Sequence, residues 1–274
     1  MYEESRPFVR KDHRNPWWHM GNAGPPCLGS EPVGASSREG PRLEKYRRSG
    51  VHVYGGLTNT ADLVVCRGGG AVVLELGTAG ADWCPCGNDW ALIEKLDAIY
   101  TVGTIPDDIH NEVFEKAWRL GKLAFTNPTR CQRLTELNLK GVAIAQVSRA
   151  DAANFGVALD APAAAVAELF LARGCASVVV TEREYGERVF DQGGTSVWMP
   201  AVPRRMSLYP SGAGAAAMIG HIVGYLGGMT MYHWANLGCL CGAHFVEHGC
   251  TPTWDDVSRL QQQWPPEGRV PNRP

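Results

Sequence analysis

From residue 96 onward, short runs of apolar, β-branched residues alternate with segments of helical periodicity, and this alternation limits the fold more than any other feature. The expected strands are Ala98–Gly103, Lys122–Asn127, Val142–Val147 and Ala176–Thr181, and the expected helices are Asp107–Leu120 and Ala161–Arg173. Continuous apolar strands separated by helices are typical of a parallel sheet covered on both faces. The sequence therefore predicts an α/β fold with a doubly wound, mostly parallel sheet, in which ligands bind at the carboxyl ends of the strands.

Two β-rich runs precede this region, Ala61–Cys66 and Ala71–Leu76, and the turn residues between them indicate a hairpin. Residues 1–30 are charged and aromatic without a period and are expected to form an irregular tail. We therefore expect one α/β domain over residues 31–264, with the hairpin at about residues 55–77 inside it, followed by a proline-rich tail over residues 265–274. A helix is expected over Pro41–Arg48, because proline suits the first turn of a helix.

The composition limits the partners and the compartment. A chain of 274 residues that is 45% hydrophobic has enough apolar surface for a core, and a net charge of −2 gives no electrostatic footprint for nucleic acid. The nine cysteines are an odd number and no secretory signal opens the chain, which favours the reduced cytoplasm. Gly212–Met229 is long and nearly uncharged, but His221 and several glycines favour a buried core helix over a membrane span.

The stretch Tyr209–Gly220 combines glycines and small residues at the expected start of a long apolar helix. Glycine lets the backbone approach a ligand closely, and the start of a helix points unpaired N–H groups outward. These donors and the helix dipole together form a natural anion site. The alternative is that the glycines serve only close packing.

This stretch resembles the C-terminal signature of the ribokinase family, the phosphofructokinase-B type of sugar and nucleoside kinases, which runs approximately Asp-Thr-x-Gly-Ala-Gly-Asp-x-Phe-x-x-Gly. Gly212, Ala213 and Gly214 match the central triplet, and Gly220 matches the closing glycine. The resemblance implies that the triplet is an anion hole for phosphate. In the family the following Asp takes the proton from the substrate hydroxyl, whereas Ala215 stands here. The resemblance thus implies an anion hole without its catalytic base.

Two further stretches resemble family motifs that contact the phosphates and the nucleotide. Ser148–Ala152 occupies the position of an Asn-x-x-Glu-Ala motif, so Ser148 and Asp151 are expected in the phosphate and metal region. Val179–Gly186 resembles Val-Val-Thr-x-Gly-x-x-Gly, which implies nucleotide contacts from Thr181 and Gly186. In this second stretch an arginine replaces the first glycine, and this side chain would either crowd a nucleotide pocket or pair with phosphate.

Three weaker matches complete the resemblance, which extends roughly from Val33 to Leu260. Thr126–Arg130 resembles an Asp-Pro-Asn-x-Arg stretch, and Ser36 stands where the family carries an acidic residue before a helix. Ala235–Cys239 resembles the helix beside the adenine, which implies a nucleotide contact from Asn236.

The resemblance implies ATP and Mg²⁺ as cofactors, a sugar or nucleoside as substrate, and a homodimer joined through lid sheets. Because Ser36, Ser148, Arg183 and Ala215 depart from the motifs, phosphorylation of a hydroxyl is expected to be weak or absent. The alternatives are a non-catalytic pseudokinase that binds a nucleotide or sugar, and a fold recruited to different chemistry. The candidate groups for the latter are Asp107, Asp108 and His110, expected in a loop after a strand, although acidic residues before a helix are usually caps.

Two cysteine clusters are candidate metal sites. Cys84 and Cys86 are separated by a proline and have no histidine nearby. The second cluster is Cys239, Cys241, His244, His248 and Cys250. In a helix Cys239 and Cys241 point about 200° apart, because each residue turns about 100°. His244 and His248 do share a helix face. Packing of small cysteines between helices is therefore favoured over zinc, and no metal ligand is assigned.

Overall fold

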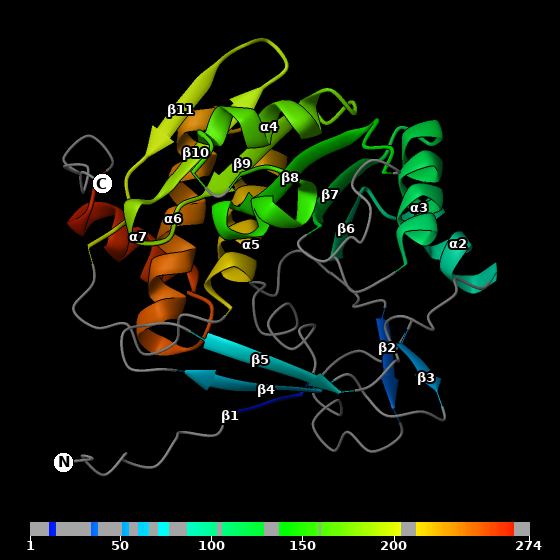
Figure 1. The fold of residues 1–274 in the computed structure, drawn as a ribbon, viewed down its shortest axis with the longest axis horizontal. Coiled ribbons are helices and arrows are strands. Elements are labelled where there is room, and N and C mark those ends of the chain that lie inside the picture. Colours follow the sequence, from blue (N-terminus) through cyan, green and yellow to red (C-terminus); the bar gives the residue numbers. More distant parts are fainter. Residues whose placement is uncertain are drawn as a thin grey trace.

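The computed structural model describes residues 11–14, 34–37, 51–54, 60–65, 71–76, 87–102, 106–128, 137–158, 160–203 and 212–265. At its centre lies a six-stranded sheet with the order β11-β10-β9-β8-β7-β6 (Figure 1). The strands are β6 (Ala98–Val102), β7 (Leu123–Asn127), β8 (Val142–Ser148), β9 (Ser177–Thr181), β10 (Glu187–Asp191) and β11 (Ser196–Met199). The first four run parallel, and β10 and β11 extend the sheet antiparallel. The predicted mostly parallel sheet is confirmed.

Helices cover both faces of this sheet (Figure 1). They are α2 (Gly87–Lys95), α3 (Asp107–Arg119), α4 (Ala163–Leu171), α5 (Ala213–Leu226), α6 (Met231–His248) and α7 (Trp254–Gln263), with the short 3-10 helices η4 (Arg149–Phe155) and η5 (Arg183–Tyr185). Helix α4 is shorter than the predicted range at both ends, and at its start Pro162 is the N-cap with an extended ψ of 150°. Helix α7 begins at a Thr253 cap, whose side chain accepts the N–H of Asp256.

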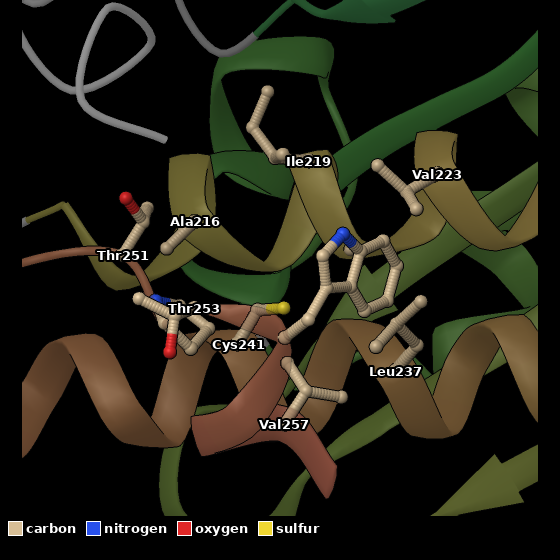
Figure 2. A pocket seen from close by; sticks show the side chains of 11 residues that line it. Ala216, Ile219, Val223, Leu237, Cys241, Thr251, Thr253 and Val257 are labelled. Carbon is tan, nitrogen blue, oxygen red and sulfur yellow. The ribbon is translucent and has the colours of Figure 1, made fainter. Parts of the chain in front are cut away.

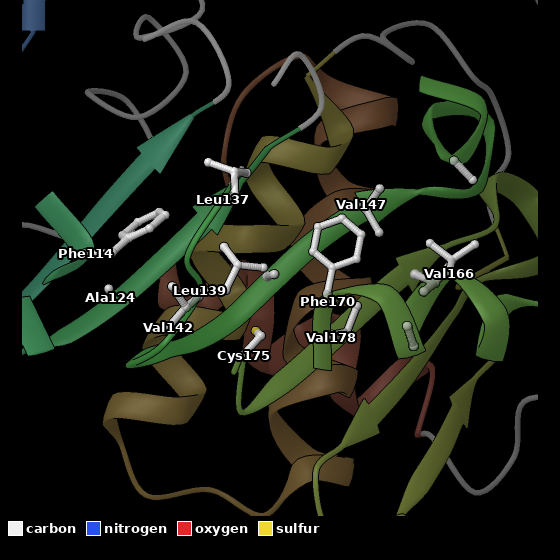
Figure 3. Close-up of a cluster of buried hydrophobic side chains, with 14 of the residues drawn as sticks. Phe114, Ala124, Leu137, Leu139, Val142, Val147, Val166, Phe170, Cys175 and Val178 are labelled. Carbon is white, nitrogen blue, oxygen red and sulfur yellow. The ribbon is translucent and has the colours of Figure 1, made fainter. Parts of the chain in front are cut away.

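The two faces of the sheet carry separate cores. Strand β9 sends Val178 and Val180 into the core under α3 and α4 (Figure 3), whereas Val179 packs on the opposite side under α5 and α6. This alternation follows from the period of two of a strand. A strand buried on both faces must be apolar throughout, which is why β9 reads as an unbroken run of valines.

Helices α5 and α6 pack against each other through glycine. A Cβ added at Gly220 would lie 2.7 Å from the carbonyl oxygen of Leu237, and one at Gly224 would lie 2.6 Å from Cβ of Trp234. Real Cβ atoms do not come this close to their neighbours, so the two helix backbones meet where no side chain fits. Gly220, the closing glycine of the signature, therefore has a packing function in this fold.

The N-terminal part of the chain contributes short strands outside the central sheet. Strands β4 (Thr60–Val65) and β5 (Ala71–Leu76) pair antiparallel, which confirms the predicted hairpin. Strand β1 (Lys11–Arg14) pairs with β4, so the prediction of an irregular tail is wrong for these four residues, whose backbone completes the ladder of β4. Strands β2 (Gly34–Ser37) and β3 (Val51–Tyr54) pair parallel. The helix predicted over 41–48 lies outside the described residues.

The candidate membrane span Gly212–Met229 contains α5, which buries Ala216, Ala217, Met218, Gly220, His221 and Gly224 inside the protein. Across the described residues, none of the helices combines the length and the apolar character that crossing a bilayer requires.

Candidate functional site

The start of α5 has the geometry expected of an anion site. Gly212 is the N-cap with φ 103°, a left-handed conformation that favours glycine. The first helical hydrogen bond runs from the N–H of Ala216 to the carbonyl of Gly212 at 3.0 Å. The N–H groups of Ala213, Gly214 and Ala215 precede this bond and are the donors that a helix start leaves available. These residues are half-buried, so a ligand can reach them. Anion binding here remains a prediction.

A side chain from the sheet fixes the position of this helix start. The Nε2 atom of Gln146 in β8 donates to the carbonyl oxygen of Gly214 at 2.7 Å. Gln146 stands two residues before Ser148, where β8 ends, and therefore near the carboxyl edge of the sheet. The donors of α5 thus lie beside the strand ends where ligands of parallel sheets bind.

Ser148 and Thr181, predicted in different motifs, are brought together. They are register partners at the ends of β8 and β9. The hydroxyl of Ser148 donates to Oδ2 of Asp151 at 2.5 Å and accepts the N–H of the same residue at 3.1 Å, which caps η4. Hydroxyl and carboxylate oxygens are ligands that Mg²⁺ prefers, so this pair fits an ion held directly or through water. The contacts shown are those of a helix cap.

An ion-pair network follows the end of β9. Glu182, which is buried, accepts hydrogen bonds from Arg149 at 3.2 Å and from Arg188 at 3.1 Å. The next residue, Arg183, has φ 55° and an exposed side chain, although it stands where the resembled motif has glycine. The backbone at this residue is therefore left-handed, a conformation that glycine adopts more readily than arginine. Gly186 is strictly needed, since its Cβ would lie 2.1 Å from the carbonyl of Met199.

Beneath the helix start lies a chain of buried polar side chains that the sequence analysis missed. His221 of α5 places Nδ1 3.0 Å from Oε1 of Gln146 and Nε2 2.8 Å from Oε1 of Glu187. The three side chains belong to residues that are at most 2% exposed. Gln146 interrupts an otherwise apolar run of β8, and this was the signal that could have revealed the chain.

An open apolar pocket lies between α5, α6 and the start of α7 (Figure 2). Its walls include Ala216, Ile219 and Val223 of α5, Leu237 and Cys241 of α6, and Trp254 and Val257 of α7. The α5 residues recur every three or four positions and form one face of the helix, opposite the face that carries His221. The pocket begins directly after the helix start. Asn236, the predicted adenine contact, precedes the pocket residue Leu237 and is itself buried at 2% exposure.

The cysteines and histidines of the cluster at 239–250 have different neighbours and do not meet at one point. Cys239 approaches the carbonyl of Met199, whereas Cys241 faces the pocket, where burial raises the pKa of its thiol to about 12. His244 and His248 lie with ring centroids 4.4 Å apart, and Cys250 Sγ lies 3.9 Å from Nε2 of His244. Within the described ranges, no group of three or more histidine, cysteine or acidic side chains is placed to hold a metal ion.

Asp107, Asp108 and His110, the candidate groups for different chemistry, lie in α3 and not in the expected loop, so that expectation is wrong. Asp107 and Asp108 occupy the first turn of α3, where acidic side chains favour the helix dipole. His110 is 0% exposed, and its ring nitrogens lie 3.2 Å from Oγ1 of Thr101 and 3.1 Å from the carbonyl of Val102. The helix begins directly after Pro106, so these side chains support structure. Thr129 and Arg130 of the match to Asp-Pro-Asn-x-Arg lie outside the described residues, as do Cys84 and Cys86.

The chain was compared with known proteins. No model of a protein family matches it, and no curated protein does. Solved structures do match. A ribokinase from Arabidopsis thaliana in complex with ribose and ATP shares 17% identity at a TM-score of 0.71, over 83% of this chain and 80% of that chain. A ribokinase from Cryptococcus neoformans in complex with ADP shares 14% identity at 0.70, over 83% and 81%.

A third similar structure is a nucleoside kinase from Burkholderia thailandensis in complex with inosine. It shares 15% identity at a TM-score of 0.65, over 86% of this chain and 81% of that chain. These similarities extend over most of each chain, and they agree with the sheet order and with the helix layers described above. The chain therefore has the ribokinase-like α/β kinase fold.

Proposed function

We propose that this chain binds a nucleotide through its phosphates at Gly212–Gly214 and phosphorylates a sugar or nucleoside hydroxyl weakly or not at all. The observation that carries the proposal is Ala215, which follows a well-formed helix start at the position of the family's catalytic base. Backbone donors do not depend on that side chain, so phosphate binding persists where base catalysis is lost.

The size of the catalytic loss follows from general chemistry. A positioned general base contributes about 10²–10⁴-fold to a rate, which corresponds to about 3–5 kcal/mol of barrier. Three carboxylates at this side of the sheet have other partners: Asp151 bonds Ser148, Glu182 pairs with two arginines, and Glu187 bonds His221. Their engagement supports a pocket without a substitute base. Phosphoryl transfer also relies on charge stabilisation, which would leave a small residual rate.

The nucleotide and its metal have candidate contacts around this helix start. In the proposal, the nucleotide site is lined by Thr181, Gly186 and Asn236. The purine ring of the nucleotide enters the apolar pocket between α5 and α6, because the indole of Trp254 and the aliphatic walls suit a flat ring. Ser148 and Asp151 would hold Mg²⁺ directly or through water. This ion would neutralise charge on the phosphates.

The proposal also covers the lid over the substrate, the oligomeric state and the compartment. We propose that the β4–β5 hairpin is a lid over the substrate and that two chains pair through their lids as a homodimer. The buried thiols of Cys175 and Cys241 suit a reducing compartment such as the cytoplasm. The competing hypothesis is a pure binding protein, a pseudokinase. Arg183 favours it, since an arginine occupies a backbone position that the motif keeps for glycine.

The test measures ATP turnover against a panel of sugars and nucleosides, together with ADP binding by calorimetry. We expect the wild type to bind ADP and to turn over near background. Ala215→Asp is expected to raise turnover by up to about 10²–10⁴-fold if the rest of the site is intact. No gain in that variant would favour the pseudokinase. A wild-type rate of about 1–100 s⁻¹, usual for kinases, would contradict the missing base.

A further inference from the structure

Helix α5 is tied to the sheet by a polar chain that the proposed function does not use. Glu187, His221 and Gln146 lie at 2%, 0% and 2% exposure in the layer between the sheet and α5. An apolar core of similar volume is often as stable as a buried ionic group, so burial of these three groups is not explained by stability alone. The chain ends at the carbonyl of Gly214, which belongs to the proposed anion hole.

The carbonyl of Gly214 fixes the direction of two hydrogen bonds in this chain. The carbonyl of Gly214 can only accept, so Gln146 must present its NH₂ group there. Its Oε1 then faces His221, which must donate from Nδ1. Nε2 of His221 and Oε1 of Glu187 lie 2.8 Å apart and form the remaining hydrogen bond of the chain. Each ring nitrogen of His221 thus has a hydrogen-bond partner.

The bond to Gly214 acts on a donor of the anion hole because a peptide unit is planar. The carbonyl of Gly214 and the N–H of Ala215 are two ends of one rigid plane. A hydrogen bond to the oxygen therefore sets the direction of that N–H, which precedes the first helical bond of α5. Without the bond, only the helical turn itself would hold this plane.

Helix α6 prevents the imidazole from turning away. A Cβ added at Gly238 would lie 1.8 Å from Nε2 of His221, so the ring rests directly on a backbone without a side chain. Trp234 packs edge to face against the ring with centroids 5.5 Å apart. The ring is thus enclosed by α6 on one side and by its two hydrogen-bond partners on the others.

We propose that Gln146, held by His221 and Glu187, is a positioning residue that keeps the first turn of α5 ordered for binding a phosphate group. This inference rests on the proposed function for its ligand. If the first turn is ordered only part of the time, the apparent affinity for phosphate falls by that fraction. Gln146 raises the ordered fraction without touching the ligand.

The test compares Gln146→Met, which removes both hydrogen bonds, with Ile144→Val as a matched control. Ile144 is fully buried on the same face of β8, and its shortening leaves the polar chain intact. ADP is the ligand probe, measured by calorimetry. The second readout, taken without ligand, is amide exchange of Ala216, whose N–H closes the first turn. One hydrogen bond corresponds to about a 2- to 10-fold change.

We expect Gln146→Met to weaken ADP binding and to accelerate the exchange of Ala216 by about this factor, while Ile144→Val changes neither. Gln146→Glu is the second variant if the methionine protein does not fold, because a carboxylate still accepts from His221 but has no N–H to donate to Gly214. Its readout is the exchange measurement alone, since its charge would repel phosphate.

The outcomes separate this inference from the proposed function. Equal ADP affinity and equal Ala216 exchange in Gln146→Met and the control would overturn the positioning role, even if both variants lose stability. If the wild type does not bind ADP but Ala216 still exchanges faster in Gln146→Met or Gln146→Glu, the nucleotide proposal fails and the control of the helix start by Gln146 stands. If the amide of Ala216 exchanges as slowly in both Gln146 variants as in the wild type, the inference is refuted, whatever the ADP affinities are.

Discussion

The buried histidine of α3 predicts how the stability of this protein depends on pH. His110 is 0% exposed, and desolvation is the main cause that lowers its pKa from 6.5 to about 4. Its hydrogen bond to the carbonyl of Val102 and the charge of Asp107 oppose this effect without cancelling it. In the unfolded chain the imidazole is hydrated and titrates near its ordinary value.

The sign follows from proton binding in the two states. Above pH 6.5 the imidazole is neutral in both states, and the folded protein keeps its full stability. Between pH 6.5 and about 4 only the unfolded chain binds the proton, so the free energy of unfolding falls as the pH falls. The difference between the two pKa values corresponds to about 3 kcal/mol, lost at up to about 1.4 kcal/mol per pH unit.

The perturbation is His110→Gln, whose amide can still donate to the carbonyl of Val102 but does not titrate. Urea unfolding of both proteins from pH 7.5 to 4.5 measures the free energy of unfolding at each step. Other groups titrate in this range, including His244, whose pKa desolvation also lowers, and they contribute equally to both proteins. The wild type should therefore lose about 2–3 kcal/mol more than the variant. Parallel pH profiles of the two proteins would refute the argument.

The turn after β9 offers two predictions of opposite sign, both measured by thermal or urea unfolding. Arg183→Gly should stabilise the protein by about 0.5–1 kcal/mol. Glycine removes the cost of the left-handed conformation, about 1–2 kcal/mol, and this gain exceeds the extra conformational entropy that glycine loses on folding. A loss of stability would show that the arginine side chain makes a compensating contact. Gly186→Ala should destabilise by about 3 kcal/mol or more, because its Cβ meets the carbonyl of Met199 at 2.1 Å and φ is 103°; wild-type stability in this variant would mean that the turn adopts another backbone.

The sheet could be predicted because its strands are specified locally. Val178–Val180 is β-branched throughout, and such a run between two helices has few other folds available. The helix start at Gly212 could be predicted for the same reason, since the glycine itself determines the backbone conformation there. Asp107 and Asp108 lie in the first turn of α3 and not in the expected loop, because sequence patterns locate the end of a helix less reliably than its existence.

The polar chain beneath α5 could not be predicted from the residues alone. Gln146 and His221 are separated by 75 positions, and Gln146 and Gly214 by 68. Their contact depends on which face of β8 receives α5, and this is decided by the handedness and order of several crossovers together. A lone glutamine in an apolar strand indicates that a partner exists, but the pattern does not name that partner.

The packing of His221 on Gly238 has a consequence for how this sequence can change over generations. With the imidazole in place, even alanine at 238 would bring a carbon within 1.8 Å of the ring. A lineage can therefore lose the histidine and keep the glycine, but it cannot lose the glycine first. Histidine at 221 could likewise arise only where glycine already stood at 238. Homologous chains should thus show a one-way association, in which histidine at 221 always occurs with glycine at 238 and glycine at 238 occurs without histidine.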